Sequence, residues 1–86
     1  MSQLNQLKDI LYRKVKINVM DKKPNPRLLD INLGEISRGM GCSVKDVECL
    51  LQHLKSEKEI KTLIPNAFSK EEYSLTIPEN SSILNR

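Results

Sequence analysis

Two helix-start signals close together in the middle of the chain constrain its fold most strongly. Asn32 is followed three residues later by Glu35, and Ser43 is followed three residues later by Asp46. In each pair the first side chain accepts hydrogen bonds from the free backbone amides of a helix's first turn, and the acid reaches back to the cap. Two helix starts so near each other predict two consecutive helices joined by a tight turn.

The residues between the two starts place the turn. Gly39 and Gly41 lie there, and glycine ends helices because it enters left-handed conformations without steric cost. The first of the two helices is therefore brief, and the second reaches about residue 57. The inner face of the brief helix is formed by Leu33, Ile36 and Met40.

The helix that starts after Ser43 has one apolar and one polar face, by its spacing at about 100° per residue. We expect five residues to point inward: Val44, Val47, Leu50, Leu51 and Leu54. The opposite face then shows Lys45, Cys49, Gln52 and Ser56, flanked by Asp46, Glu48, His53 and Lys55.

An amphipathic helix is also predicted over residues 2–19. Its core stripe consists of Leu4, Leu7, Leu11 and Val15. Ile10 and Ile17 form a second apolar line more than about 100° away around the same helix. Either a later segment of the chain covers these two residues, or they contact a second copy. With Leu84 near the C-terminus, they are the residues we expect in a dimer contact.

Two prolines in alternation, Pro24 and Pro26, exclude a continuing helix and make residues 21–27 a loop. Leu28, Leu29 and Ile31 follow as a short apolar run. This run is long enough for a minimal strand.

The C-terminal part reads as a hairpin. Residues 60–64 and 73–77 are β-prone, and residues 65–72 between them form a long polar tip. Residues 79–86 are polar and are expected to be mobile. The chain, at 86 residues, is then one domain over residues 1–78 with a flexible polar tail.

The order helix, short strand, helix, tight turn, helix, hairpin resembles the winged helix-turn-helix family of small bacterial and archaeal DNA-binding regulators. The segment LGEISRGMGCS is similar to the family's helix-turn-helix, although Ser37 replaces the usual alanine where the helices approach closely. VKDVECLLQHLKSEKEI resembles the third helix and its exit into the wing, with Glu59 where glycine is common. The resemblance implies an α+β winged-helix fold, a three-helix core with a C-terminal two-stranded wing.

The resemblance also implies a function: sequence-specific regulation of transcription by a third helix that reads the major groove of double-stranded DNA. Lys45 can donate to guanine and Gln52 can pair with adenine. Phosphate contacts would come from the wing and from cations of the first helix and its loop, because residues 1–30 carry seven cations against three acids. The DNA-binding residues expected on this basis are Ser43, Lys45, Asp46, Cys49, Gln52, His53, Lys61, Asn66 and Lys70.

The charge of the third helix leaves a second interpretation open. Asp46 and Glu48 are repelled by phosphates, and the helix shows no arginine. Some winged helices bind protein partners instead, so an adaptor within a nucleic-acid-processing complex is the alternative. Salt discriminates the two, since binding through phosphates weakens steeply as salt rises.

Other function classes find little support. His53 is the only histidine, so no catalytic residue, and no enzyme, is predicted. Cys42 and Cys49 are too far apart on their predicted elements for a disulfide, and with His53 they offer at most three metal ligands, so free thiols and no metal or cofactor are expected. No small-molecule substrate is indicated. No apolar run approaches a membrane span or a signal peptide, which predicts a soluble, cytoplasmic protein.

Overall fold

Polar caps start all three α-helices of residues 2–85, the part of the chain that the computed structural model describes. The helices are α1 (Gln3–Met20), α2 (Leu33–Met40) and α3 (Val44–Ser56). Their caps are Ser2, Asn32 and Ser43, and each cap oxygen accepts from a backbone amide of the first turn. The two helix starts predicted at Asn32 and Ser43 are thus confirmed.

The turn between α2 and α3 forms at Gly41 as predicted, whereas Gly39 lies within α2 and does not end it. Gly41 takes a left-handed conformation with φ of 71°, which suits a residue without a Cβ. The amide of Cys42 then donates to the carbonyl of Ser37 at 3.1 Å and closes the end of α2. Ser37 itself is buried, and its hydroxyl donates to the carbonyl of Gly34 at 2.8 Å, so this polar side chain is satisfied inside the helix pair.

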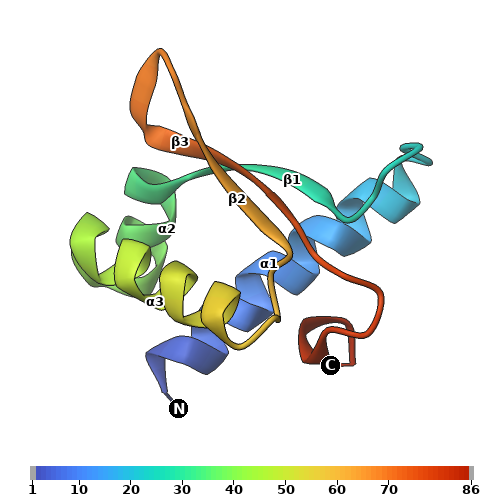
Figure 1. The fold of residues 1–86 in the computed structure, drawn as a ribbon, viewed down its shortest axis with the longest axis horizontal. Coiled ribbons are helices and arrows are strands. Elements are labelled where there is room, and N and C mark those ends of the chain that lie inside the picture. The colour runs from blue at the N-terminus through green and yellow to red at the C-terminus, as the bar shows by residue number, and fades with distance from the viewer. Residues whose placement is uncertain (1, 86) are drawn as a thin grey trace.

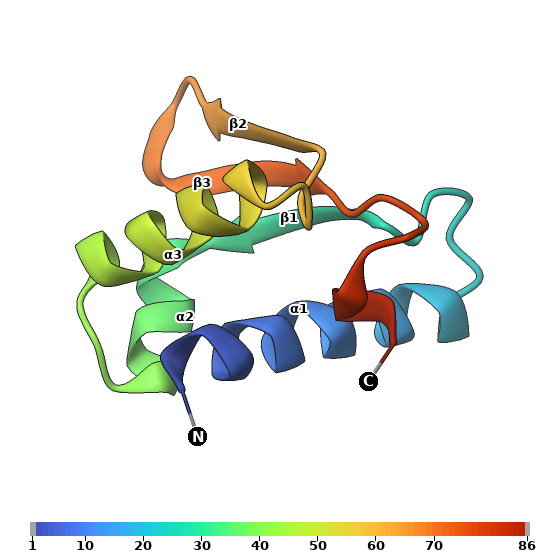
Figure 2. The same ribbon diagram turned by 60° about the horizontal axis from the view of Figure 1, so that its bottom comes forward.

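Three strands form one antiparallel sheet in the order β1-β3-β2. They are β1 (Leu28–Asn32), β2 (Thr62–Asn66) and β3 (Ser69–Thr76). Leu75 of the central strand pairs with Leu29 on one side and with Leu63 on the other. Leu75 and Leu29 are buried, and the helices cover this inner face of the sheet (Figures 1 and 2).

The hairpin is longer than the sequence pattern predicted. Residues 65–72 were expected as a loop, but most of them extend β2 and β3, and the chain turns between Asn66 and Ser69. The pattern missed these strand residues because the arms of the hairpin extend away from the core. Outside the core, neither face of a strand needs apolar side chains.

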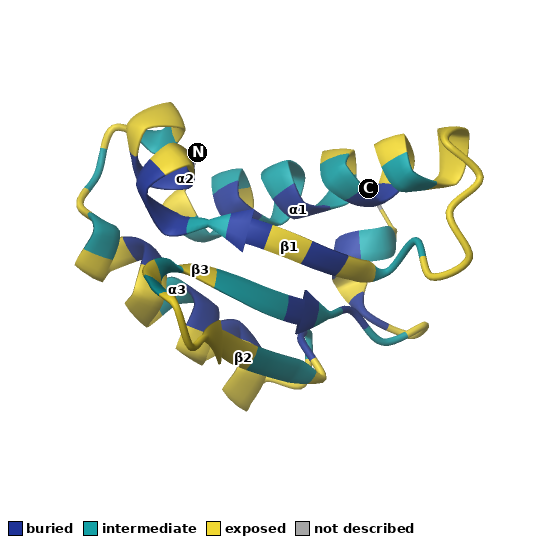
Figure 3. Cartoon of the chain, turned by 90° about the horizontal axis from the view of Figure 1, so that it is seen from above, coloured by how far each residue is buried: buried dark blue, intermediate teal, exposed yellow. Residues whose placement is uncertain are grey.

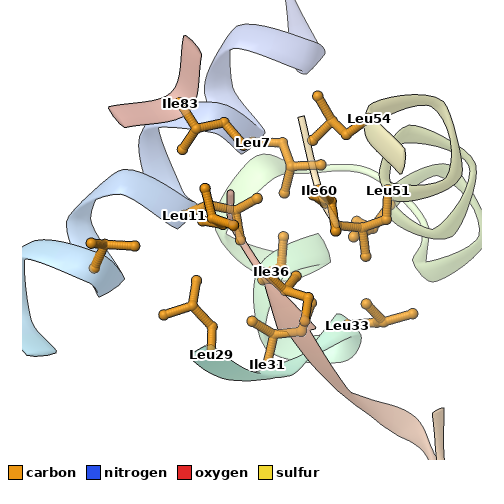
Figure 4. Packing of buried hydrophobic residues seen from close by; sticks show 14 residues of the cluster. Leu7, Leu11, Leu29, Ile31, Leu33, Ile36, Leu51, Leu54, Ile60 and Ile83 are labelled. Atoms are coloured by element: carbon orange, nitrogen blue, oxygen red, sulfur yellow. The ribbon is translucent and has the colours of Figure 1, made fainter. Parts of the chain in front are cut away.

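One apolar cluster joins all elements. Seen from above, buried positions face one another across α1, the sheet and α3 (Figure 3), and Figure 4 shows their packing. Its buried members are Leu7, Leu11, Val15, Leu29, Ile31, Leu33, Ile36, Val47, Leu51, Leu54, Ile60, Leu75, Ile77 and Ile83. The stripe predicted on α1 supplies three of them, and Leu4 packs partly buried against the cluster.

The C-terminal segment corrects the expectation of a polar tail outside the domain. Ile83 is completely buried in the cluster beside Leu7 (Figure 4), and it lies in a short 3-10 helix, η1 (Ser82–Leu84), against α1. Ser81 is also buried, and its hydroxyl donates to Glu59. Two adjacent apolar residues in a polar stretch dock residues 79–85 against α1: Ile83 enters the core beside Leu7, and Leu84 packs partly buried against it.

The element order α1-β1-α2-α3-β2-β3 is that of a winged helix. The chain is therefore an α+β protein with a three-helix core and a C-terminal wing formed by β2 and β3, as predicted. None of the helices within residues 2–85 has the length and apolar character that a membrane span requires.

Candidate nucleic-acid interface

Helix α3 presents a polar face to solvent because its opposite face is fixed in the core. Val47, Leu51 and Leu54 are at most 1% exposed, whereas Lys45 and Gln52 lie on the exposed side. The orientation of α3 agrees with the helical spacing in the sequence. Three buried side chains over two turns hold this helix rigidly, as a surface that reads DNA requires.

Ser43 and Asp46 are exposed but are already engaged with each other. The hydroxyl of Ser43 accepts from the amide of Asp46 at 3.1 Å, and the carboxylate of Asp46 accepts from the amide of Ser43 at 3.4 Å. This capping box stabilises the start of α3. A base contact by either side chain would compete with it, so we assign these two residues to helix positioning first.

The remaining predicted contact residues are all exposed and fall on two elements. Lys45, Cys49, Gln52 and His53 lie on α3, while Lys61, Asn66 and Lys70 lie on the wing and at its base. Asn66 differs from the two lysines of the wing, because its side-chain oxygen accepts a hydrogen bond from the backbone amide of Phe68 at 2.7 Å. Asn66 thus shapes the tip of the wing, while Lys61 and Lys70 keep their charged ends in solvent.

The acidic side chains near the α3 face and the wing differ in their positions and contacts. Asp46 is held in the capping box and Glu48 is exposed on α3. Glu71, by contrast, turns back from β3 to the first turn of α2, where a Cβ built on Gly34 would lie 2.7 Å from its Oε1. A carboxylate at a helix N-terminus interacts favourably with the free amides and the helix dipole. Glu71 is therefore directed away from the tip of the wing.

Phe68 was not singled out from the sequence, and it is the most exposed large apolar side chain among the described residues, at 98%. It lies at the tip of the wing between β2 and β3. The signal that could have found it is its isolation, since the only phenylalanine of the chain stands in a polar segment predicted to be a loop tip.

The residues expected in a dimer contact separate into two groups. Ile10 and Leu84 pack partly buried against the core of the same chain. Ile17 is 56% exposed and shares a surface hollow with Leu28. Of the second apolar line on α1, only Ile17 is left for a partner, with Met20 nearby on the last turn.

The two cysteines are free thiols. Cys42 packs half-buried against the core, and Cys49 is exposed on α3. Within residues 2–85 no three His, Cys, Asp or Glu side chains lie close enough together to hold a metal ion.

A polar hollow of about 360 Å³ lies beside β1 and β3 and includes Glu72 and Asn32 in its wall. Its groups pair partly with each other, since the hydroxyl of Ser74 donates to Asp30 at 2.8 Å. Lys14 of α1 and Glu35 of α2 also line the hollow, and none of its lining residues lies on α3.

Compared with known proteins, the chain matches no family model, no curated protein and no solved structure. What the α3 face and the wing can bind is accordingly argued from their geometry and chemistry.

Proposed function

We propose that this chain is a sequence-specific DNA-binding regulator of transcription whose helix α3 lies in the major groove of double-stranded DNA. The observation that carries the proposal is the outward face of α3 next to a projecting wing. The major groove, about 12 Å wide, admits one helix. In α3 one side is anchored by Val47, Leu51 and Leu54, and the other exposes Lys45 and Gln52.

Three residues of α3 have the chemistry for reading bases. Lys45, Cys49 and Gln52 are spaced so that they share one face of the helix. Lys45 donates to the acceptors of guanine, and the amide of Gln52 can both donate to and accept from adenine. His53 lies at the margin of this face and would reach the groove edge.

Phosphate contacts are assigned to the wing rather than to the loop after α1. Lys61 and Lys70 are exposed on or beside the hairpin. Lys22 and Lys23, by contrast, lie in the loop at the end of the molecule far from the start of α3 (Figures 1 and 2). We therefore assign no phosphate contact of the α3 footprint to the loop cations.

Pairing of two copies of the chain would double the small DNA footprint of a single domain. Ile17 and Met20 are exposed at the C-terminal end of α1, and we place the dimer contact there, with Ile10 and Leu84 supporting it from within each copy. Two-fold pairing would match palindromic DNA sites. As a DNA-bound regulator without catalytic chemistry, the protein would work in the cytoplasm with the chromosome.

The second candidate is a protein-binding adaptor, and the acids of α3 favour it. Asp46 and Glu48 flank the proposed reading face, and carboxylates near phosphates are repelled. An interface with a protein would tolerate this mixed charge.

A gel shift with genomic fragments at low and at high salt tests the proposal. The probe variant combines Lys45→Ala with Gln52→Ala, and the matched control combines Lys23→Ala with Asn25→Ala in the exposed loop at the far end. We expect binding that weakens steeply with salt and is lost in the first variant only. If no fragment binds at low salt, or if both variants bind alike, DNA reading by α3 is wrong and a protein partner becomes the leading candidate.

A further inference from the structure

The tip of the wing offers a single aromatic ring to solvent. Phe68 is 98% exposed, and the hairpin that carries it projects beyond the body of the molecule (Figure 1). We propose that Phe68 is a wedge that enters the minor groove of duplex DNA and partly unstacks one base step while α3 occupies the neighbouring major groove. The inference rests on the proposed function and adds a residue and a mode of DNA distortion to it.

The wedge is held in place by its own turn. The amide of Phe68 donates to Oδ1 of Asn66 at 2.7 Å, and the register of the hairpin shifts between Pro65 and Asn66. Proline restricts the backbone before the turn, and the asparagine side chain replaces a backbone acceptor within it. The backbone that carries the ring is thus already ordered, so insertion costs little backbone conformational entropy.

One cation and one engaged carboxylate lie beside the ring. Lys70 is exposed two residues after Phe68. Of the nearest acids, Glu71 lies over Gly34 at the start of α2, whereas Glu72 is exposed beside the tip and accepts from Nδ2 of Asn66 at 3.5 Å. The tip therefore presents an apolar ring and a cation, and the carboxylate nearest to them is hydrogen-bonded to Asn66. Apolar wedges with neighbouring cations are the means by which proteins unstack base steps from the minor groove.

The tip and α3 are placed so that one duplex can reach both. In two views the wing tip and the N-terminal turn of α3 lie toward the same end of the molecule, away from the loop after α1 (Figures 1 and 2). β2 packs beside α3 at the base of the wing. A duplex that receives α3 in its major groove thus passes under the wing with an adjoining minor groove.

A second copy of the chain fits the tip less well than DNA does. Stable protein interfaces bury roughly 800 Å² on each partner, and the neighbours of the ring at the tip are Ala67 and Ser69, which are small. One ring among small polar residues can fill the gap between two base pairs, but it cannot form the apolar centre of a dimer.

Fluorescence tests the wedge directly, because the chain contains no tryptophan. Phe68→Trp places a single reporter at the tip, and Asn25→Trp places a control reporter in the exposed loop after α1, at the far end. Both full-length variants are titrated at low salt with a duplex that the wild-type chain retains in the gel shift. We expect the emission of the tip reporter to fall by about half or more, since stacking on bases quenches indole, and the control to stay unchanged. Phe68→Ala should weaken binding about tenfold and reduce the bend seen by energy transfer between the duplex ends.

The outcomes separate the wedge from the proposed function. If duplex binding depends on Lys45 and Gln52 but the tip reporter stays unquenched and Phe68→Ala binds normally, the wedge is wrong and DNA reading by α3 stands. If no duplex binds at all, both are wrong. Self-association that is lost in Phe68→Ala would likewise overturn the wedge, because it would show that the ring contacts protein.

Discussion

Ser81 donates a 2.6 Å hydrogen bond from its hydroxyl to Oε2 of Glu59, and this contact ties the C-terminal segment to the turn that follows α3. The same oxygen accepts from the amide of Ser82 at 2.6 Å, while the ammonium of Lys8 donates to the Ser82 hydroxyl at 3.3 Å. Glu59 thus links the C-terminal segment to the end of α3 through one carboxylate oxygen. It caps the segment that brings Ile83 into the core.

This contact makes part of the stability depend on pH. The hydrogen bond from Ser81 lowers the pKa of Glu59 below its ordinary value; partial burial opposes this, and the amide of Ser82 and the charge of Lys8 support it. A carboxylate with a lowered pKa in the folded state stabilises the fold fully above the ordinary glutamate pKa of about 4.3, and this contribution is lost as the pH falls through the folded-state pKa. We expect Glu59→Gln to lower the free energy of unfolding by about 1 kcal/mol at neutral pH.

Denaturant unfolding at pH 7 and at about pH 3 measures this effect, with exposed Glu79→Gln as the control in the same segment. The difference between wild type and Glu59→Gln should shrink at the lower pH, because the contribution of the ionised carboxylate is lost as the pH falls toward its folded-state pKa. An equal difference at both pH values would contradict the role of the ionised Glu59.

Ile83 should behave as a core residue in spite of its place near the C-terminus. It is completely buried beside Leu7, so Ile83→Ala removes buried methyl groups and leaves a cavity. The expected loss is about 2–4 kcal/mol in the free energy of unfolding. Asn80→Ala, an exposed change in the same segment, should cost less than about 0.5 kcal/mol. Equal small effects in thermal or denaturant unfolding would mean that the segment is not docked in solution.

Two glycines two residues apart should respond in opposite directions to the same substitution. Gly39 is exposed within α2, and a Cβ there would meet nothing within 4 Å. Gly39→Ala is therefore expected to stabilise the protein by about 0.5–1 kcal/mol. Gly41 has φ of 71°, so Gly41→Ala should destabilise it by about 1 kcal/mol. Melting temperatures of the two variants test the turn geometry, and a shift of the same sign in both would be inconsistent with it.

The salt dependence of DNA binding should report the phosphate contact of Lys70. Lys70 is exposed near the tip of the wing, and each phosphate contact contributes about 0.9 to the slope of log K against log salt. Lys70→Ala should reduce this slope by about 1 and weaken binding alike for different sequences. Lys23→Ala, in the far loop, serves as the charge-matched control and should leave the slope unchanged. A slope that responds to Lys23 rather than to Lys70 would place the DNA on the other end of the molecule.

The sequence by itself determined most of the helical part. The starts of α2 and α3, the turn at Gly41 and the inward face of α3 depend on local capping and on helical periodicity, which act over a few residues and can be counted along the chain. The outward placement of Lys45 and Gln52 followed from the same periodicity.

Only the tertiary structure decided the length of the hairpin, the docking of the C-terminal segment and the fate of the second apolar line of α1. Ile10 and Leu84 look alike in sequence to Ile17, yet the fold packs the first two partly against the core and leaves Ile17 exposed. It likewise draws Glu71 over Gly34 and leaves Phe68 alone at the wing tip. Each of these outcomes depends on contacts between residues far apart in the chain. Such contacts form on whatever surface remains uncovered once the helices have packed, and local sequence patterns do not specify that surface.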